Sequence, residues 1–228
     1  LFSKPFSLQI QDIQPFVGQH IRAGKWLFLT ALSQWWAGNL LLVASGIYLG
    51  ATALGALRLA QSLFGVLNVL LQTFEHYILP QTALHLHKSL SYGLHYLKNA
   101  NQKLGLAFFP VLMAAFVFAE PILAFAGGAV YAPYAFVLRG LCILYVFVYL
   151  SQPIRFLVRA LQLNRCFFYG YLLNLGFALA SSQWLLSHFG LHGVLAGLIA
   201  AQAILLLYWT LMLKQQKNIN VWKSFISY

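Results

Sequence analysis

The sequence predicts an all-α, polytopic transmembrane bundle of six helices with both termini in the cytoplasm. Three observations lead to this fold class. Hydrophobic residues make up 61% of the 228 residues and charged residues only 7%, whereas a soluble domain carries about 25% charged residues. Apolar runs long enough to cross about 30 Å of hydrocarbon recur along the whole chain. The Lys and Arg residues gather between alternate runs, where membrane topology places them.

The predicted elements follow one another with short connections. Residues 1–25 are mixed in character and interrupted by Pro15 and Gly18, and they begin without Met. This pattern is typical of an interfacial segment, or of a linker in a fragment of a longer chain, with Trp26 at the headgroup level. We expect one transmembrane lobe over residues 26–213 and a basic cytoplasmic tail over 214–228. The spans cover about 26–48, 54–79 (ended by Pro80), 104–126, 134–153, 166–187 and 192–213.

The boundary between the last two spans is marked by glycines and not by charged residues. Between Arg165 and Lys214 there is no Lys, Arg, Asp or Glu. This interval is long enough for two spans, and the glycines of "SHFGLHG", residues 187–193, permit a reversal between them.

The positive charges orient the bundle. Segments 1–25, 80–103, 154–165 and the tail each carry three Lys or Arg residues, which makes twelve of the 14 in the chain. The intervening loops near 49–53, 127–133 and 188–191 carry none. By the positive-inside rule, the four basic segments are cytoplasmic.

Polar residues form a stripe along the second span. Its members step by three or four residues, so a helix places them on one face. Asn and Gln side chains of this kind also hydrogen-bond between membrane helices. Charged residues inside spans are costly, however, and usually face a bundle interior or a watery cavity. The whole stripe therefore favours a cavity-lining helix; it comprises Arg58, Gln61, Gly65, Asn68, Gln72 and Glu75.

Other spans supply groups that could complete such a cavity. The candidates for substrate binding are Arg58, Gln61, Asn68, Gln72, Arg139, Gln34 and Asn174. Topology places Arg58, Arg139 and Glu120 towards the outer side, where they form either a cationic patch for an anionic substrate such as a phosphate or a neutralising Arg–Glu pair. Glu75 and Glu120 are candidates for coupling to protons or sodium. Glu75 lies near the cytoplasmic interface, which also favours solvation or a salt bridge.

Several chemistries find little support. The three acidic residues, Asp12, Glu75 and Glu120, are too far apart in sequence to predict a carboxylate pair, so we expect no enzyme, no metal site and no cofactor. The histidines of "HLHK", residues 85–88, fit a solvated loop. Cys142 and Cys166 give no disulfide framework. The net charge of +11 is explained by topology, so nucleic acid is not an expected partner.

Three stretches resemble polysaccharide flippases of the multidrug/oligosaccharidyl-lipid/polysaccharide superfamily. They are "YLGATALGALRLAQSLFGVLNVLLQTFEHYILPQTAL" at 48–84, "FAGGAVYAPYAFVLRGL" at 125–141 and "FGLHGVLAGLIAAQ" at 189–202. The resemblance covers about residues 20–213 and rests on patterns of small and apolar residues. It implies an exporter of lipid-linked saccharides that alternates access between two six-helix lobes, with Arg58 and Arg139 as the cations facing a diphosphate carrier.

The resemblance also implies partners and a location. This chain has room for one lobe, so the lobe works beside a missing half or a second copy, in a bacterial inner membrane. The partners are the bilayer and a lipid-linked anionic saccharide. A cation-coupled drug exporter of the same superfamily and a non-transporting membrane scaffold remain alternatives. A scaffold would bury the stripe between helices without any water-accessible cavity.

Overall fold

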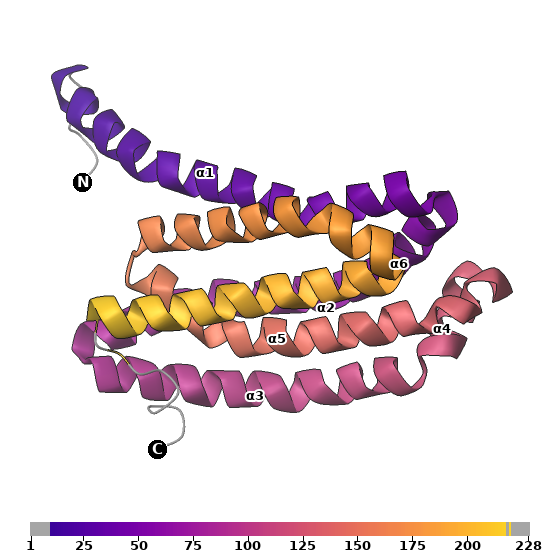
Figure 1. The fold of residues 1–228 in the computed structure, drawn as a ribbon. Helices are drawn as coiled ribbons and strands as arrows, with labels where there is room; N and C mark the ends of the chain where they lie inside the picture. The colour runs from indigo at the N-terminus through magenta and orange to yellow at the C-terminus, as the bar shows by residue number, and fades with distance from the viewer. Residues whose placement is uncertain (1–9, 218, 220–228) are drawn as a thin grey trace.

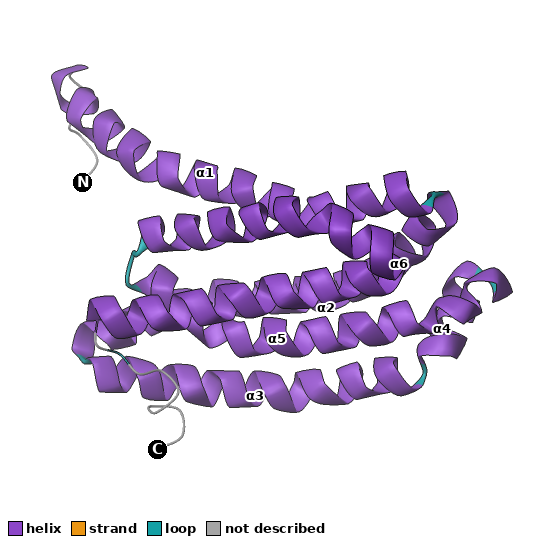
Figure 2. Cartoon of the chain, viewed as in Figure 1, coloured by secondary structure: helices purple, strands orange, loops and turns teal. Residues whose placement is uncertain are grey.

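The computed structural model describes residues 10–217 and Ile219, and every element in that part of the chain is helical (Figures 1 and 2). Five helices are long and apolar enough to cross a membrane. The prediction of an all-α, multi-pass membrane bundle is confirmed at this level. The elements are α1 (Ile10–Leu49), α2 (Ala51–Lys88), α3 (Leu90–Val117), α4 (Ala119–Gly127), the 3₁₀ helix η1 (Ala129–Tyr134), α5 (Ala135–Ala160) and α6 (Asn164–Lys217).

Helix α6 contains a reversal at Gly190. Its 54 residues form two arms, and Gly190 between them has φ 56° and ψ −133°, a conformation that suits glycine. Figure 1 shows α6 doubling back at this point. Gly193 permits the close approach of the two arms at this turn, because a Cβ there would overlap the backbone carbonyl of Leu185. The reversal expected within residues 187–193 is confirmed, while the count of six membrane crossings stays a prediction.

Helices α2 and α5 each continue past a proline near the expected end of their span. Helix α2 runs through Pro80 to Lys88, so the expected end at Pro80 is wrong. Proline removes one helical hydrogen bond, but Ile78 and Thr82 on either side of it are buried and packing holds the helix together. Likewise α5 passes through Pro153 and ends at Ala160.

The remaining boundaries differ because the helices are longer than the apolar runs. Helix α3 begins at Leu90 and not near residue 104. The Ser89 side chain caps this start by accepting a hydrogen bond of 3.1 Å from the backbone N–H of Tyr92. It ends at Val117, and a break at Phe118 separates α4 from it. Residues 10–25, expected to be interfacial, belong to the continuous helix α1. Residues 1–9, 218 and 220–228 lie outside the described residues, and with them most of the predicted tail.

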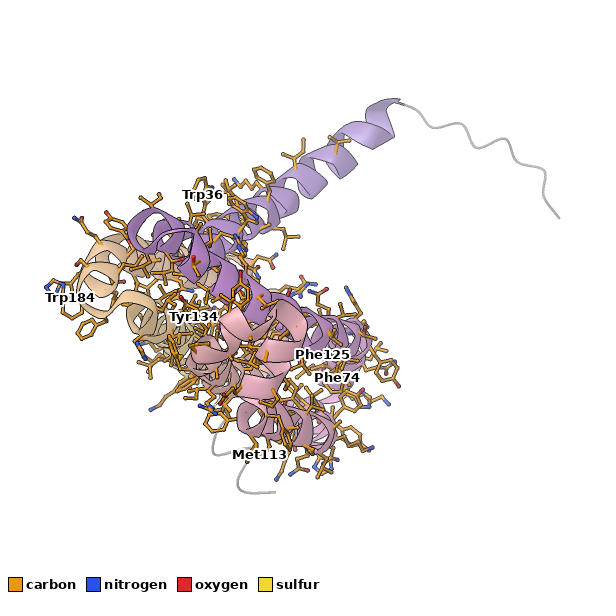
Figure 3. All side chains as sticks on the ribbon, turned by 90° about the vertical axis from the view of Figure 1, so that its right-hand side faces the viewer. Trp36, Phe74, Met113, Phe125, Tyr134 and Trp184 are labelled. Carbon is orange, nitrogen blue, oxygen red and sulfur yellow. The ribbon has the colours of Figure 1, made fainter. Side chains whose placement is uncertain are left out.

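Helix α5 occupies the centre of the bundle. It packs against α2, α3 and α6. Helix α1, in contrast, packs mainly along α6 and only in part on α2. The buried side chains of α5 belong to two apolar cores, Leu138 to one and Leu157 to the other. Large apolar side chains also cover the outside: Trp36, Met113 and Trp184 project from the surface and are about half exposed or more (Figure 3). This outer surface fits a lipid environment.

The two ends of the bundle differ in chemistry. The turns at Gly50 and Gly190 lie together with α4 and η1 at one end, which we call the glycine end (Figures 1 and 2). The turn at Ser89, the α5–α6 connection and the end of α6 lie at the other, which we call the basic end. The helix termini at the basic end carry Lys88, Arg159, Arg165 and Lys214.

Candidate functional site

Two polar cavities lie inside the bundle. The larger, about 460 Å³, lies between α1, α2, α5 and the first arm of α6 towards the basic end, and we call it the charged cavity. The smaller, about 290 Å³, lies next to it and also borders the second arm of α6; we call it the amide cavity. The two share five lining residues, which makes them neighbouring parts of one polar region: Gln34, Asn68, Val148, Arg155 and Tyr171.

A carboxylate with two arginine partners lines the charged cavity. Glu75 of α2 is buried, and its two oxygens take separate partners from α5. Oε2 accepts from Arg155 and Oε1 accepts from Arg159. The Arg155 Nη2 that serves Glu75 also donates to Gln152 Oε1 at 2.8 Å. These contacts tie α2 to α5 near the basic end.

The charges in this cavity do not cancel. Two guanidinium groups face one carboxylate, which leaves an excess of one positive charge among the residues lining it. The side chain of Arg155 is 21% exposed and that of Arg159 is 40% exposed, so both remain partly accessible. The buried Nε of Arg155 has no hydrogen-bond partner among the described residues. Arginine keeps its charge at any physiological pH, so the cavity has a permanent surplus of cationic N–H donors.

The amide cavity has unpartnered polar atoms of its own. Asn174 Oδ1 and Trp209 Nε1 are buried and find no hydrogen-bond partner in the part of the chain that the structure describes. Gln202 donates to Ser151 Oγ at 2.6 Å and so joins the second arm of α6 to α5. A buried polar atom without a partner costs about 1–3 kcal/mol. Water or a polar ligand in the cavity would remove that cost.

Five of the predicted residues meet at these cavities. Gln34 and Asn68 line both, Gln72 and Glu75 line the charged cavity, and Asn174 lines the amide cavity. They come from α1, α2 and α6, so the structure brings together side chains that the sequence places more than a hundred residues apart.

The other predicted residues lie elsewhere. Arg58 is exposed near the glycine end, and Gln61 is half-buried; neither lines the two polar cavities. Arg139 Nε donates to the carbonyl of Phe116 at 3.3 Å. Glu120 is exposed, and among residues 10–217 it forms no ion pair with Arg58 or Arg139. For Arg58 and Gln61 the reason is the length of the stripe, which extends over about 25 Å of helix and so reaches beyond a single cavity.

The two arginines of the charged cavity, Arg155 and Arg159, were not among the site residues predicted from the sequence. Both were assigned to the basic segment 154–165, because the preceding apolar span was expected to end at about residue 153. In the structure the helix continues, and Gln152, Arg155 and Arg159 follow steps of three and four on one face. The same spacing that identified the α2 stripe would have identified this set.

Comparisons with known protein families, curated proteins and solved structures find no match for this chain. Within residues 10–217, no group of three His, Cys, Asp or Glu side chains is placed to hold a metal ion. The arrangement is suited to binding an anion through arginine N–H groups, next to a cavity lined by neutral amides.

Proposed function

We propose that this chain is one lobe of a membrane transporter, and that its polar cavities bind the head of an anionic, lipid-linked saccharide precursor during transfer across the bilayer. One observation carries the proposal: inside an apolar helical bundle, Arg155 and Arg159 face a cavity of about 460 Å³, and Glu75 is the only carboxylate opposing them among its described lining residues. Ionisable groups at membrane depth mark substrate pathways by default.

The chemistry of the cavities supports an anion that carries a polar neutral group. Arginine N–H groups recognise phosphate oxygens well, because the guanidinium is a planar fork of donors. The amide cavity next to it offers Gln34, Asn174 and Gln202, which can both donate to and accept from hydroxyl groups. The resemblance to polysaccharide flippases supplies the lipid carrier and the mechanism, alternating access of two lobes around the site, with no covalent chemistry.

The exposed part of the α2 stripe supports a second lobe. Asn68 and Gln72 line the charged cavity yet remain exposed, because α1 packs along α6 and leaves this side of α2 open. Polar side chains are costly in lipid. In our proposal, a second six-helix lobe, from a longer chain or another copy, faces this side in a bacterial inner membrane.

The coupled drug exporter is the weaker alternative. A carboxylate that couples transport to protons or sodium must have an oxygen available to the ion. Both oxygens of Glu75 are instead engaged by arginines.

Cysteine accessibility tests the proposal. In a background with Cys142 and Cys166 replaced by Ala, single cysteines are placed at the cavity positions Asn68 and Gln72. Val69 and Leu70 serve as matched controls, since they are exposed on the apolar side of the same two turns of α2. The protein, expressed in cells with any second lobe, is then treated with a membrane-impermeant thiol reagent.

We expect labelling at Asn68→Cys and Gln72→Cys only, with a lipid-linked saccharide diphosphate slowing the reaction. Absence of labelling at all four positions in folded protein would contradict a water-filled cavity and favour the scaffold alternative. Labelling that the saccharide does not slow would retain the cavity and reject this substrate.

A further inference from the structure

We propose that Glu75 is a resident counter-ion: its carboxylate occupies the anion site formed by Arg155 and Arg159, and an incoming phosphate or diphosphate group displaces it. This inference rests on the proposed function, because it concerns the same cavity. It assigns to Glu75 the role of competing with the substrate, which differs from ion coupling and from binding.

The geometry of the ion pairs carries the inference. Each Glu75 oxygen engages a different arginine, so a single carboxylate bridges two guanidinium groups. The arginines lie one helical turn apart on α5 and belong to the wall of a cavity large enough for a further group. A phosphoryl group offers the same kind of acceptor oxygens with more negative charge. It can therefore replace the carboxylate at both arginines.

The surplus of cation and donor makes the exchange possible. With Glu75 in place, the cavity still carries one excess positive charge, and Arg155 Nε has no partner within the described chain. An anion entering the cavity gains this donor in addition to those that Glu75 gives up. Among the described residues that line the charged cavity, Glu75 is the one carboxylate that opposes an anion.

The exchange has a structural consequence. Glu75 lies on α2, whereas Arg155 and Arg159 lie on α5, and their ion pairs hold these helices together near the basic end. An anion that takes over the arginines releases Glu75 and with it this tie between α2 and α5. Occupation of the site is thereby coupled to separation of two helices.

The test is anion affinity after removal of the carboxylate. Wild-type protein and Glu75→Gln are reconstituted, with any second lobe, into nanodiscs of phosphatidylcholine. Binding of inorganic diphosphate is measured by titration calorimetry. Because Gln keeps the shape and removes the charge, we expect Glu75→Gln to bind diphosphate about tenfold more tightly than wild type. Arg155→Gln should bind more weakly than wild type.

Thr73→Ala is the matched control. Thr73 lies on α2 two residues before Glu75, is exposed and does not line the charged cavity, so its truncation should leave the affinity within about twofold. A second set of nanodiscs contains phosphatidylglycerol. If membrane phosphates reach the site, this anionic lipid weakens diphosphate binding to Glu75→Gln; if only aqueous phosphate reaches it, affinity is unchanged. Either result identifies the source of the phosphate within the proposal.

The outcomes separate this inference from the proposed function. Equal or weaker binding by Glu75→Gln, with wild type binding diphosphate, overturns the inference and leaves the anion site intact. Failure of both proteins to bind diphosphate or saccharide diphosphate overturns the proposed function as well. If Glu75→Gln does not fold alone, it is purified in diphosphate: recovery only with diphosphate supports the inference, and loss under both conditions overturns it.

Discussion

Tyr149 shows how a single polar contact is used inside this apolar bundle. Its hydroxyl donates a hydrogen bond of 2.8 Å from α5 to the carbonyl oxygen of Asn101 in α3. The ring is buried and stacks on Phe108, and Gly105 leaves room for the hydroxyl because a Cβ there would collide with it. Steric fit and a hydrogen bond thus act at the same place between α3 and α5.

We expect Tyr149→Phe to lower the free energy of unfolding by about 1 kcal/mol, because the ring contacts remain and one hydrogen bond is lost. Tyr169→Phe is the control, since Tyr169 is 49% exposed. Unfolding by SDS in mixed micelles measures both. A loss of equal size in the two variants would show that the Asn101 contact contributes nothing specific.

At the residue scale, the sequence predicts which side chains share a face of one helix, but not which faces meet. Asn68, Gln72 and Glu75 lie together as their spacing requires. Their partners on α5 depend on packing between helices that are far apart in sequence, and no spacing rule specifies it. The pairing of Glu75 with Arg155 and Arg159, in place of a pairing of Glu120 with Arg58 or Arg139, is information of this second kind.

The reversal in α6 is the element on which the bundle's last two helical arms depend. Both arms border the amide cavity, so their approach also shapes the site. Gly193 permits this approach where a side chain would overlap the Leu185 carbonyl, which is backbone and cannot move aside cheaply.

We expect Gly193→Ala to destabilise the protein by about 1–3 kcal/mol through overpacking. Gly176→Ala, in the first arm of the same helix, has open space around the added methyl group and should be neutral or slightly stabilising. Thermal unfolding in detergent compares them. Equal effects would indicate that α6 adjusts its turn at no cost.

Element boundaries were predictable only in part, for a physical reason. Hydropathy reports where a helix leaves the hydrocarbon, and charge and proline were read as its end. Hydrogen bonding along the helix and packing against neighbours continue beyond that point, as Lys98 and Lys103 within α3 show. The glycine reversal was predictable because glycine adopts positive φ at little cost, and three of the four positive-φ residues in the described chain are glycines.

The arrangement of charge over the whole molecule predicts its orientation. Cations gather at the helix termini of the basic end, where the described parts of α1 and α6 also have their outer ends (Figure 1). By the positive-inside rule we expect this end to face the cytoplasm and the glycine end, with α4 and η1, to face outward.

Topology labelling checks this orientation. In the background without Cys142 and Cys166, we expect a cysteine at Phe125, which is 95% exposed at the glycine end, to react with an impermeant thiol reagent in intact cells. A cysteine at Ser89, exposed at the basic end, should react only after permeabilisation. The reverse pattern would place the basic end outside and remove the basis for a substrate entering from the cytoplasm.

Glu75 lies far along α2 from the turn at Gly50, so a small rotation of α2 at that turn displaces Glu75 by several ångströms. From Gly50 to Glu75, α2 extends about 37 Å at 1.5 Å per residue. A pivot of α2 by about 5° at that turn would carry Glu75 sideways by about 3 Å, which is enough to break a hydrogen-bonded ion pair. Small rotations at one end of the molecule are thereby magnified into the making or breaking of contacts at the other.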